Sequence, residues 1–344
     1  MMVFLKLHFT NSFNFKLRFS SLTVTFLIVM MILQMQVSAQ ESSNYVMYRN
    51  GIHSYNPGAS GMFHKHKTSI NGKYFPNTSL GDDVKSVSVF VDQQVPVLKG
   101  GIGFSYTYDI WDDSRYNHNL GISYAYHFDL GSAGKLGAGI NFGLITCKFK
   151  RLFWTFDGGP FLYDTTTIKI VFTPGLAYKF KNFDLGISIG LRNRDSFVLE
   201  KNMYFFNSPA INIFTSYKIY TGPKFSLTPG VYAVFYPRTD SDRYRNEKMT
   251  TNYNFNLTAN FSEQFWIGAA YIRNFDWGHM SQSFFTYPDG FFVSSGIDIK
   301  EKYGIGLSLM PKIFKQDHYN NDSFRKALFY YAEFVISYKL KPEN

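Results

Sequence analysis

The chain has 344 residues, a formal net charge of +10 and a single cysteine, and aromatic residues make up 19% of it. The positive charge is spread along the chain without a Lys/Arg run of the kind that marks nucleic-acid-binding arms, so we expect no nucleic-acid partner. The lone Cys147 cannot form an internal disulfide, which excludes a disulfide-stapled fold. A soluble domain could hold 37 Phe and 25 Tyr residues only by burying most of them.

Residues 1–39 have the three parts of a secretory signal peptide. The first acidic residue is Glu41, and the preceding stretch carries three basic residues, Lys6, Lys16 and Arg18. An apolar run at 22–33 follows, and Val37-Ser38-Ala39 gives a small-x-small cleavage site. The run is shorter than the ~20 residues that a membrane-spanning helix needs. We therefore predict cleavage after Ala39. The alternatives are an uncleaved anchor and, because the basic region is long, a true start downstream of Met1.

Beyond this region, apolar residues alternate with small or polar ones. In 252–261, Tyr253, Phe255, Leu257 and Phe261 share one face, and the opposite face consists of Asn and Thr. The same period of two residues occurs at 101–108, 119–128, 184–191 and 303–309. A soluble sheet would place more Lys, Glu and Arg on its wet face. The pattern favours membrane strands with lipid outside and a polar lumen inside, which also explains a mean hydropathy of only −0.16.

About fourteen segments of this kind follow one another, and most are near the 9–11 residues that a tilted membrane strand needs. We place them at 66–74, 84–93, 100–109, 117–128, 134–147, 167–180, 183–192, 208–220, 224–236, 250–261, 264–273, 290–299, 302–311 and 328–340. Short and long connections alternate, as in outer-membrane barrels with short periplasmic turns. The sequence therefore predicts an all-β protein, a transmembrane antiparallel up-and-down β-barrel of about 14 strands (12–16 possible). Its barrel spans 66–344, a periplasmic N-terminal segment spans 40–65, and both termini are periplasmic.

Proline and glycine add two expectations about the wall. Pro174 and Pro229 fall inside predicted strands, where a missing N–H predicts a bulge or a displaced strand boundary. Glycines on inward faces would let side chains or a plug approach the wall closely. The other inward residues are mostly Ser, Asn, Thr and Ala. The charged exceptions that we expect there are isolated: Lys169, Lys179, Lys218 and Asp298.

No set of residues predicts catalysis or cofactor binding. His64-Lys65-His66, with His53 upstream, could bind a metal, but the adjacent lysines oppose a cation and no carboxylate completes the site. The other histidines are scattered, and none has the Ser or paired-carboxylate context of a hydrolase. We expect no enzyme activity, cofactor or metal. Arginines in predicted outer loops could meet lipopolysaccharide phosphates; they are Arg192, Arg194, Arg238, Arg243 and Arg245.

The order of several short motifs resembles a known family. Tyr55-Asn56-Pro57-Gly58-Ala59-Ser60-Gly61 is similar to the Asn-Pro signature near the mature start of PorP/SprF proteins, which belong to the type IX secretion and gliding machinery of Bacteroidetes. The sequences that continue the match in family order are Val87–Phe90 before Pro96, Gly100-Gly101-Ile102-Gly103 leading to Asp109, Tyr124-Ala125-Tyr126 and Leu136-Gly137-Ala138-Gly139. The resemblance is strongest over 45–145. It implies an outer-membrane accessory that links periplasmic secretion-ring components to export or surface attachment of cargo such as adhesins.

The resemblance also suggests partner-contact residues. Asn56, Pro57 and Gly61 would lie at the periplasmic rim, either as the turn that launches the first strand or as a docking surface; we favour the turn. Glu333 retains the acid of a terminal family motif whose preceding residues differ here, and Gly58-Ala59 replaces the family's Ala-Tyr. The expected partners are outer-membrane lipid and lipopolysaccharide, the periplasmic ring and a cargo protein. The rival hypothesis is a porin-like or substrate-selective outer-membrane channel, for which charged lumen rings would be expected.

Overall fold

The computed structural model describes residues 48–75, 84–111, 115–154, 160–195, 205–236, 250–262, 264–274, 290–300, 302–311 and 329–340. The predicted signal peptide and most of the long connections lie outside these residues. The short helical elements are η2 (Tyr48–Gly51), α2 (Ile52–Tyr55), η3 (Pro57–Ala59), η4 (Pro96–Leu98) and η5 (Gly131–Ala133). Within the described ranges, no helix is long and apolar enough to cross a membrane.

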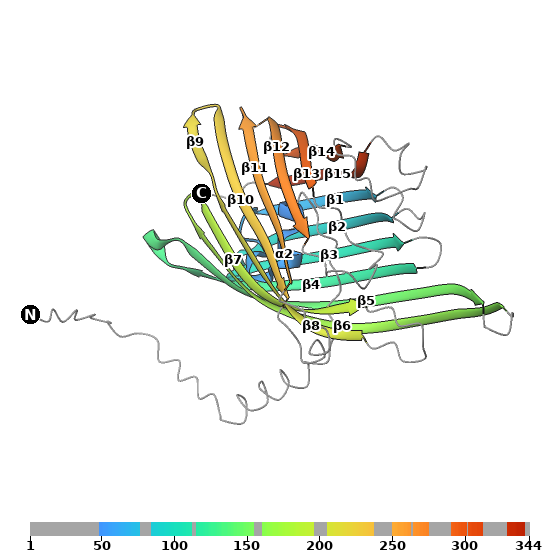
Figure 1. Cartoon of the computed structure of the whole chain (residues 1–344). Coiled ribbons are helices and arrows are strands. Elements are labelled where there is room, and N and C mark those ends of the chain that lie inside the picture. Colours follow the sequence, from blue (N-terminus) through green and yellow to red (C-terminus); the bar gives the residue numbers. More distant parts are fainter. Residues whose placement is uncertain are drawn as a thin grey trace, which may run out of the picture. The chain divides into compact units, whose positions relative to one another are not determined.

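The strands form one antiparallel sheet (Figure 1). They are β1 (His66–Phe75), β2 (Val84–Val95), β3 (Gly100–Trp111), β4 (Arg115–Asp129), β5 (Lys135–Trp154), β6 (Pro160–Phe180), β7 (Phe183–Asp195), β8 (Phe205–Tyr217), β9 (Ile219–Gly222), β10 (Phe225–Tyr236), β11 (Thr250–Phe261), β12 (Phe265–Asn274), β13 (Gly290–Ile299), β14 (Tyr303–Pro311) and β15 (Phe329–Leu340). Each strand pairs with its neighbours in sequence, as expected for an up-and-down meander, except that β8 and β9 both pair with β10.

The sheet closes on itself because β1 pairs with β15 from His66↔Leu340 to Tyr74↔Ala332. Only Lys218 separates β8 from β9, and both pair with β10, so they form one interrupted wall strand. Counted in this way, the described wall is a closed barrel of fourteen strands, which confirms the predicted count. Closure leaves no sheet edge at the join between the first and last strands, where a lipid environment could not satisfy unpaired backbone groups.

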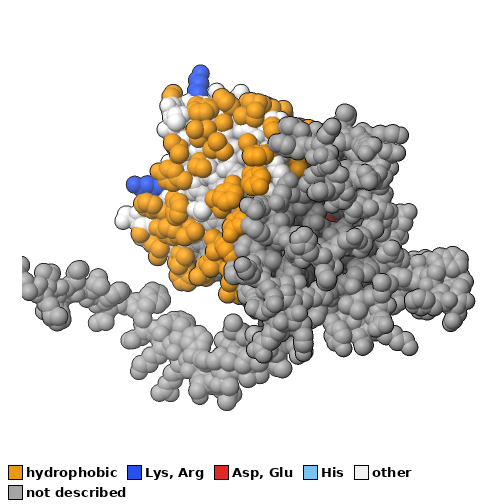
Figure 2. All heavy atoms as spheres, viewed as in Figure 1, with side chains coloured by type: hydrophobic (Ala, Val, Ile, Leu, Met, Phe, Trp, Pro, Cys, Tyr) orange, Lys and Arg blue, Asp and Glu red, His pale blue; other side chains and the backbone are white. Residues whose placement is uncertain are grey.

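The barrel is apolar outside and polar inside, the reverse of a soluble protein. Phe255 and Leu257 on β11 are 49% and 47% exposed, whereas Asn254 on the opposite face is 5% exposed. Figure 2 shows apolar side chains covering the visible part of the outer wall, with Lys or Arg side chains only at its margins. The five alternating segments that predicted membrane strands all follow this pattern. An exposed apolar surface of this extent is stable only against lipid.

Of the two alternatives predicted for the prolines, a bulge or a displaced strand boundary, the bulge was wrong. Pro174 stays in register opposite Ile140, and Pro229 stays in register opposite Leu257. On the other side of each proline the ladder is broken. The β6–β7 pairing ends at Gly175, and the pairing of β10 with the interrupted wall strand β8/β9 is missing between Leu227 and Gly230. Proline lacks the N–H that would extend a ladder. Pro174 therefore lies where pairing with one neighbour ends, and Pro229 lies in a gap of that pairing, in both cases without an inserted residue.

Candidate functional site: a segment inside the barrel

Residues 48–64, here called the inner segment, pack against the inner face of the barrel. The segment contains η2, α2 and η3, and Figure 1 shows α2 among the strands of the wall. Ser60 and Ala59 are completely buried, and Asn56 is 1% exposed. Pro57 at the first position of η3 suits a helix start, and the Asn56 side chain caps η3 by accepting from the Gly58 N–H. The sequence thus builds a compact turn here.

Glycines on the inner wall allow the backbone of the inner segment to approach the strands. A Cβ on Gly139 would lie 2.5 Å from the carbonyl group of Pro57, and one on Gly137 would lie 2.1 Å from the Gly58 oxygen. A Cβ on Gly101 would be 2.2 Å from the Ser60 oxygen. These distances leave no room for any side chain at the three wall positions. The prediction that inward glycines let another part of the protein approach the wall closely is confirmed.

Hydrogen bonds fasten the inner segment to four different strands. Asn56 Nδ2 donates to the Leu176 carbonyl on β6 at 2.9 Å, and the Gly61 N–H donates to Asp92 Oδ1 on β2 at 2.6 Å. Ser60 and Ser123 on β4 share a hydrogen bond of 2.7 Å, and Ser188 on β7 donates to the Tyr55 carbonyl at 2.5 Å. Gly61 has a φ of +66°, which glycine adopts readily. Each hydrogen bond contributes about 1 kcal/mol, so together these bonds hold the inner segment in one position against the wall.

His53 adds a buried contact to β3. Its Nε2 lies 3.0 Å from the Phe104 carbonyl, for which the ring must carry the proton on that nitrogen. Burial lowers the pKa of His53, because the charged imidazolium would lose its hydration there. The neutral ring stacks edge-on against Phe90, with the ring centroids 6.0 Å apart. His53 is therefore a structural residue of the seated segment.

An apolar cluster forms where the inner segment meets the wall. Ile52, Tyr55, Ala59 and Met62 pack with wall residues that are themselves buried, Phe90, Ala177, Phe214, Tyr232 and Val234. The rings of Tyr55 and Tyr232 meet at 5.4 Å. Large inward side chains on β8 and β10 thus complement the glycines of β3, β5 and β6. The lumen at this level holds a small protein core rather than a polar channel.

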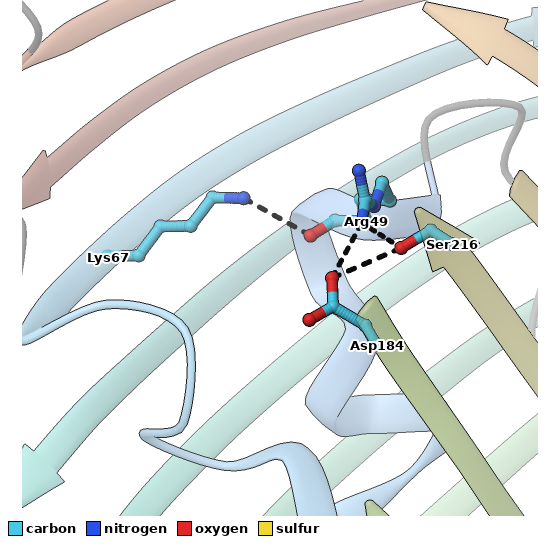
Figure 3. Close-up of polar contacts among 4 residues, drawn as sticks. All are labelled: Arg49, Lys67, Asp184 and Ser216. Atoms are coloured by element: carbon cyan, nitrogen blue, oxygen red, sulfur yellow. Dashed lines mark hydrogen bonds and ion pairs between the residues drawn. The ribbon is translucent and has the colours of Figure 1, made fainter. Parts of the chain in front are cut away.

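The beginning of the inner segment is tied to three strands by polar contacts (Figure 3). The Arg49 guanidinium lies 3.1 Å from the Asp184 carboxylate on β7 and 2.5 Å from Ser216 Oγ on β8. Ser216 also donates to Asp184 at 3.1 Å, and Lys67 Nζ on β1 donates to the Arg49 carbonyl at 3.2 Å. Arg49 therefore connects β1 with β7 and β8, which lie far from β1 around the barrel.

A second inward group forms a buried polar belt across neighbouring strands. Register pairs connect Ser308 to Glu333, Glu333 to Lys73, Lys73 to Ser86, and Ser86 to Asp109. Each of these residues is at most 3% exposed. Ser86 donates to Asp109 at 2.5 Å, and Tyr331 donates to Glu333 at 3.1 Å. The belt joins five strands at one level of the lumen.

The expectation of only isolated inward charges was therefore incomplete. The structure adds buried inward charges on β1, β2, β3 and β15, namely Lys67, Lys73, Asp92, Asp109 and Glu333. Their alternation with apolar outer residues was visible in the sequence. Charges can occupy these positions because they face one another and polar neighbours across the lumen, where burial without such partners would be costly.

The structure places the four predicted contact residues in two groups. Asn56, Pro57 and Gly61 lie together in the inner segment, and Glu333 lies in the polar belt of the wall. All four are buried. Sequence reasoning missed Arg49, His53, Ser60 and Asp92 as partners in seating the segment. The sequence did offer one signal. The small residues of 56–61 come before strands whose inward faces are rich in glycine.

The histidine cluster is not brought together. His53 contacts Phe104, whereas His66 Nδ1 lies 2.6 Å from Gln93 and its Nε2 lies 3.0 Å from Thr68. Within the described parts of the chain, no three His, Cys, Asp or Glu side chains are grouped as metal ligands. His279, His318, Asp82-Asp83 and Asp112-Asp113 lie outside the described residues, as do Arg238, Arg243 and Arg245. The geometry described above fastens a peptide segment in place.

Comparisons with known proteins agree with this architecture. A hydrocarbon-channel variant described as "TodX monoaromatic hydrocarbon channel deltaS2 mutant" is 8% identical, with a TM-score of 0.51 over 84% of this chain and 93% of that one. A FadL homologue from Pseudomonas aeruginosa is 9% identical, with a TM-score of 0.49 over 83% and 92% of the two chains. At such identities the likeness concerns the fold alone. No curated protein matches the sequence.

The family model described as type IX secretion system membrane protein PorP/SprF matches residues 37–328. That range contains the inner segment and all strands except β15. The match covers most of the chain, and the closed antiparallel barrel described above is a fold of outer-membrane proteins. This chain belongs to the PorP/SprF family of type IX secretion system membrane proteins.

Proposed function

We propose that this protein is an accessory of type IX secretion that acts from a fixed position in the outer membrane. In this role it links periplasmic secretion-ring components to the export or surface attachment of cargo proteins such as adhesins. The observation that carries the proposal, beyond family membership, is the buried inner segment: the lumen is occupied by the protein's own chain. A barrel filled in this way acts through its rims, where partners can be recognised.

We further propose that the short-turn end of the barrel faces the periplasm and that both termini lie there. Short periplasmic turns and long outer loops are the usual arrangement of such barrels. The outer wall would contact lipid, and the long connections would meet lipopolysaccharide. On this orientation, the inner segment would enter the barrel from the periplasmic side, where the ring components are.

The four predicted contact residues have a different role in this proposal. Asn56, Pro57 and Gly61 are buried in the seated segment, so a direct partner contact requires the segment to leave the wall. We propose that they position the segment, and that partners meet the exposed rim around it. Glu333 is completely buried in the polar belt and would act as a positioning residue of the wall.

A channel for small apolar or polar solutes is the second candidate. Structures described as hydrocarbon channels share the barrel fold at 8% identity, which carries no substrate to this chain. A channel function would require the inner segment to be displaced or bypassed. Removal of the segment would raise conductance under both hypotheses. The two hypotheses differ in the effect of losing the whole barrel, because only an accessory then loses cargo export.

The decisive experiment deletes the gene and compares secreted and surface proteins with those of the parent strain by quantitative proteomics. The expected result is the loss of one or a few cargo proteins from the surface and their accumulation in the periplasm, restored by the full-length gene. Unchanged export, together with ion conductance by the purified full-length barrel in planar bilayers, would favour the channel and refute the accessory role.

A further inference from the structure

Cations gather inside the barrel mouth at the end where the short turns lie. The inward side chains that form this group are Arg49, Lys67, Lys135, Lys179 and Lys339. Four of them, Arg49, Lys67, Lys179 and Lys339, surround His64 closely enough to lower its pKa, in addition to the larger effect of burial. Basic side chains are therefore concentrated at this mouth.

Carboxylates in the described part of this mouth are already engaged. Asp184 pairs with Arg49 at 3.1 Å, and Asp298 pairs with Lys339 at 2.7 Å. Asp92 accepts from the Gly61 N–H, and Asp129 accepts from the Gly131 N–H. These four acids leave an excess of cations, because five further lysines stand on the rim around them.

The rim lysines are exposed and occupy the turns themselves: Lys99, Lys181, Lys224, Lys300 and Lys302. Lys99, Lys181 and Lys300 have φ values of 49°, 50° and 50°. Glycine or asparagine is less strained in this left-handed region. Turn geometry alone therefore does not select lysine at these positions. By sequence, Glu263 and Glu301 in the same short turns only partly offset the excess.

By sequence, the connections at the opposite end are net acidic, and the adjoining strand ends offset this charge with Arg115, Lys150, Arg151, Arg192 and Arg194. The seven longer connections at 76–83, 112–114, 155–159, 196–204, 237–249, 275–289 and 312–328 contain thirteen acidic and nine basic residues. The protein is thus polarised along the barrel axis, with positive charge concentrated at the short-turn mouth. An asymmetric field of this kind orients and attracts a partner of opposite charge.

From this polarity we infer that the short-turn mouth, formed by the inward cations and the rim lysines, is a docking surface for an acidic segment of a periplasmic protein. The inference rests on the proposed function for the periplasmic orientation, and it adds the chemistry of the partner. The five inward cations favour a protein over lipid, because phospholipid headgroups contact the outside of a barrel and not its lumen. Carboxylate side chains on a flexible segment can reach the exposed rim lysines, and the half-buried Lys135 and Lys179 extend the positive charge into the lumen.

The test uses full-length protein in nanodiscs of phosphatidylcholine and a fluorescein-labelled poly-L-glutamate peptide as the probe. One variant combines Lys99→Asn, Lys181→Asn and Lys300→Asn, which removes three rim charges and suits the left-handed turn geometry. The matched control combines Lys248→Asn, Lys315→Asn and Lys326→Asn, which removes three charges from the long connections. Heat-modifiable migration on gels confirms that each barrel is folded.

Fluorescence anisotropy at about 0.15 M salt, where exposed charges are screened beyond about 8 Å, should give an affinity roughly tenfold weaker for the rim variant. The control should bind like the parent. If the rim triple does not fold, Lys181→Asn alone should weaken binding by about twofold to threefold. The inference would be overturned if both triple variants bound the peptide equally weakly, or if the parent protein did not bind it.

A second set of measurements, in a different lipid, distinguishes protein carboxylates from lipid headgroups as the source of negative charge. Nanodiscs that contain phosphatidylglycerol should leave peptide binding within about twofold of that in phosphatidylcholine, since the inward cations are out of reach of lipid. Abolition of peptide binding in these discs would assign the mouth to lipid and refute the inference. Peptide binding is measured without export, so its failure is distinguishable from failure of the secretion role in the gene-deletion experiment.

Discussion

The side-chain amide of Asn56 donates a hydrogen bond to the carbonyl oxygen of Leu176, 2.9 Å away on β6. The same amide accepts from the Gly58 N–H at 2.9 Å. Gly175 and Gly186 on the adjacent wall leave the space that this side chain occupies, because a Cβ on either would come within 2.6 Å of the amide. One residue thus shapes the turn of the inner segment and attaches it to the barrel.

Asn56→Ala should loosen the inner segment while leaving the barrel intact. Losing two hydrogen bonds destabilises the seated state by about 2 kcal/mol, which raises the population of the released segment roughly thirtyfold. The measurement is the rate of maleimide labelling of Ser60→Cys, a buried position, in a Cys147→Ser background. Asn182→Ala, in a turn between β6 and β7, is the control and should leave the rate unchanged. Equal rates in all three proteins would contradict the role assigned to Asn56.

Gly139→Ala should displace the inner segment by a steric clash. The new Cβ would lie 2.5 Å from the Pro57 carbonyl group, where backbone must move, at a cost of about 1–3 kcal/mol. Gly143→Ala on the same strand and face is the matched control, because its Cβ would meet its nearest neighbour at 3.5 Å. Planar-bilayer recordings should show higher conductance for Gly139→Ala than for Gly143→Ala. Identical conductance would mean that the segment does not close the lumen.

Acid should release the inner segment. Burial lowers the pKa of His53 and of His64 in the seated state below the ordinary value of 6.5. The released segment therefore binds protons more readily, so the stability of the seated state is complete above pH 6.5 and falls as pH drops below it. Labelling of Ser60→Cys, normalised to the exposed position Ser132→Cys, should rise between pH 7.5 and pH 5.

The double variant His53→Gln and His64→Gln provides the control for this pH dependence. Glutamine retains a hydrogen-bond donor that can reach the Phe104 carbonyl, but it does not titrate. The normalised labelling of this variant should be flat across the same pH range. A rise of the same size in the variant would assign the pH response to other groups.

Leu307→Arg should destabilise the barrel according to depth in the membrane. Leu307, in the middle of β14, is 45% exposed on its outer face, opposite the outward Phe334 of β15. An arginine facing the middle of the bilayer costs about 2–4 kcal/mol, against about 0–1 kcal/mol near the interface. Tyr303→Arg, at the beginning of the same strand, is the matched control. Urea unfolding in lipid vesicles measures both, and equal losses would contradict the membrane position assigned to β14.

The alternation of residues determined the wall of the barrel. Outward residues such as Leu257 and inward residues such as Asn254 differ because lipid and lumen are different solvents, and a period of two residues records that difference locally. Strand number, antiparallel order and the apolar outer face could therefore be predicted from the sequence. The family resemblance in 55–61 also pointed to the correct family.

Only the tertiary structure decided what fills the barrel. Whether residues 48–64 extend away from the first strand or fold back inside depends on contacts with strands more than a hundred residues away, such as Asn56 with Leu176. Local sequence does not encode such contacts: the glycines at 137 and 139 show that something approaches the wall, but not which segment it is. The two prolines show the same limit, because a missing N–H permits either a bulge or a broken ladder. The choice follows from the position of the neighbouring strand.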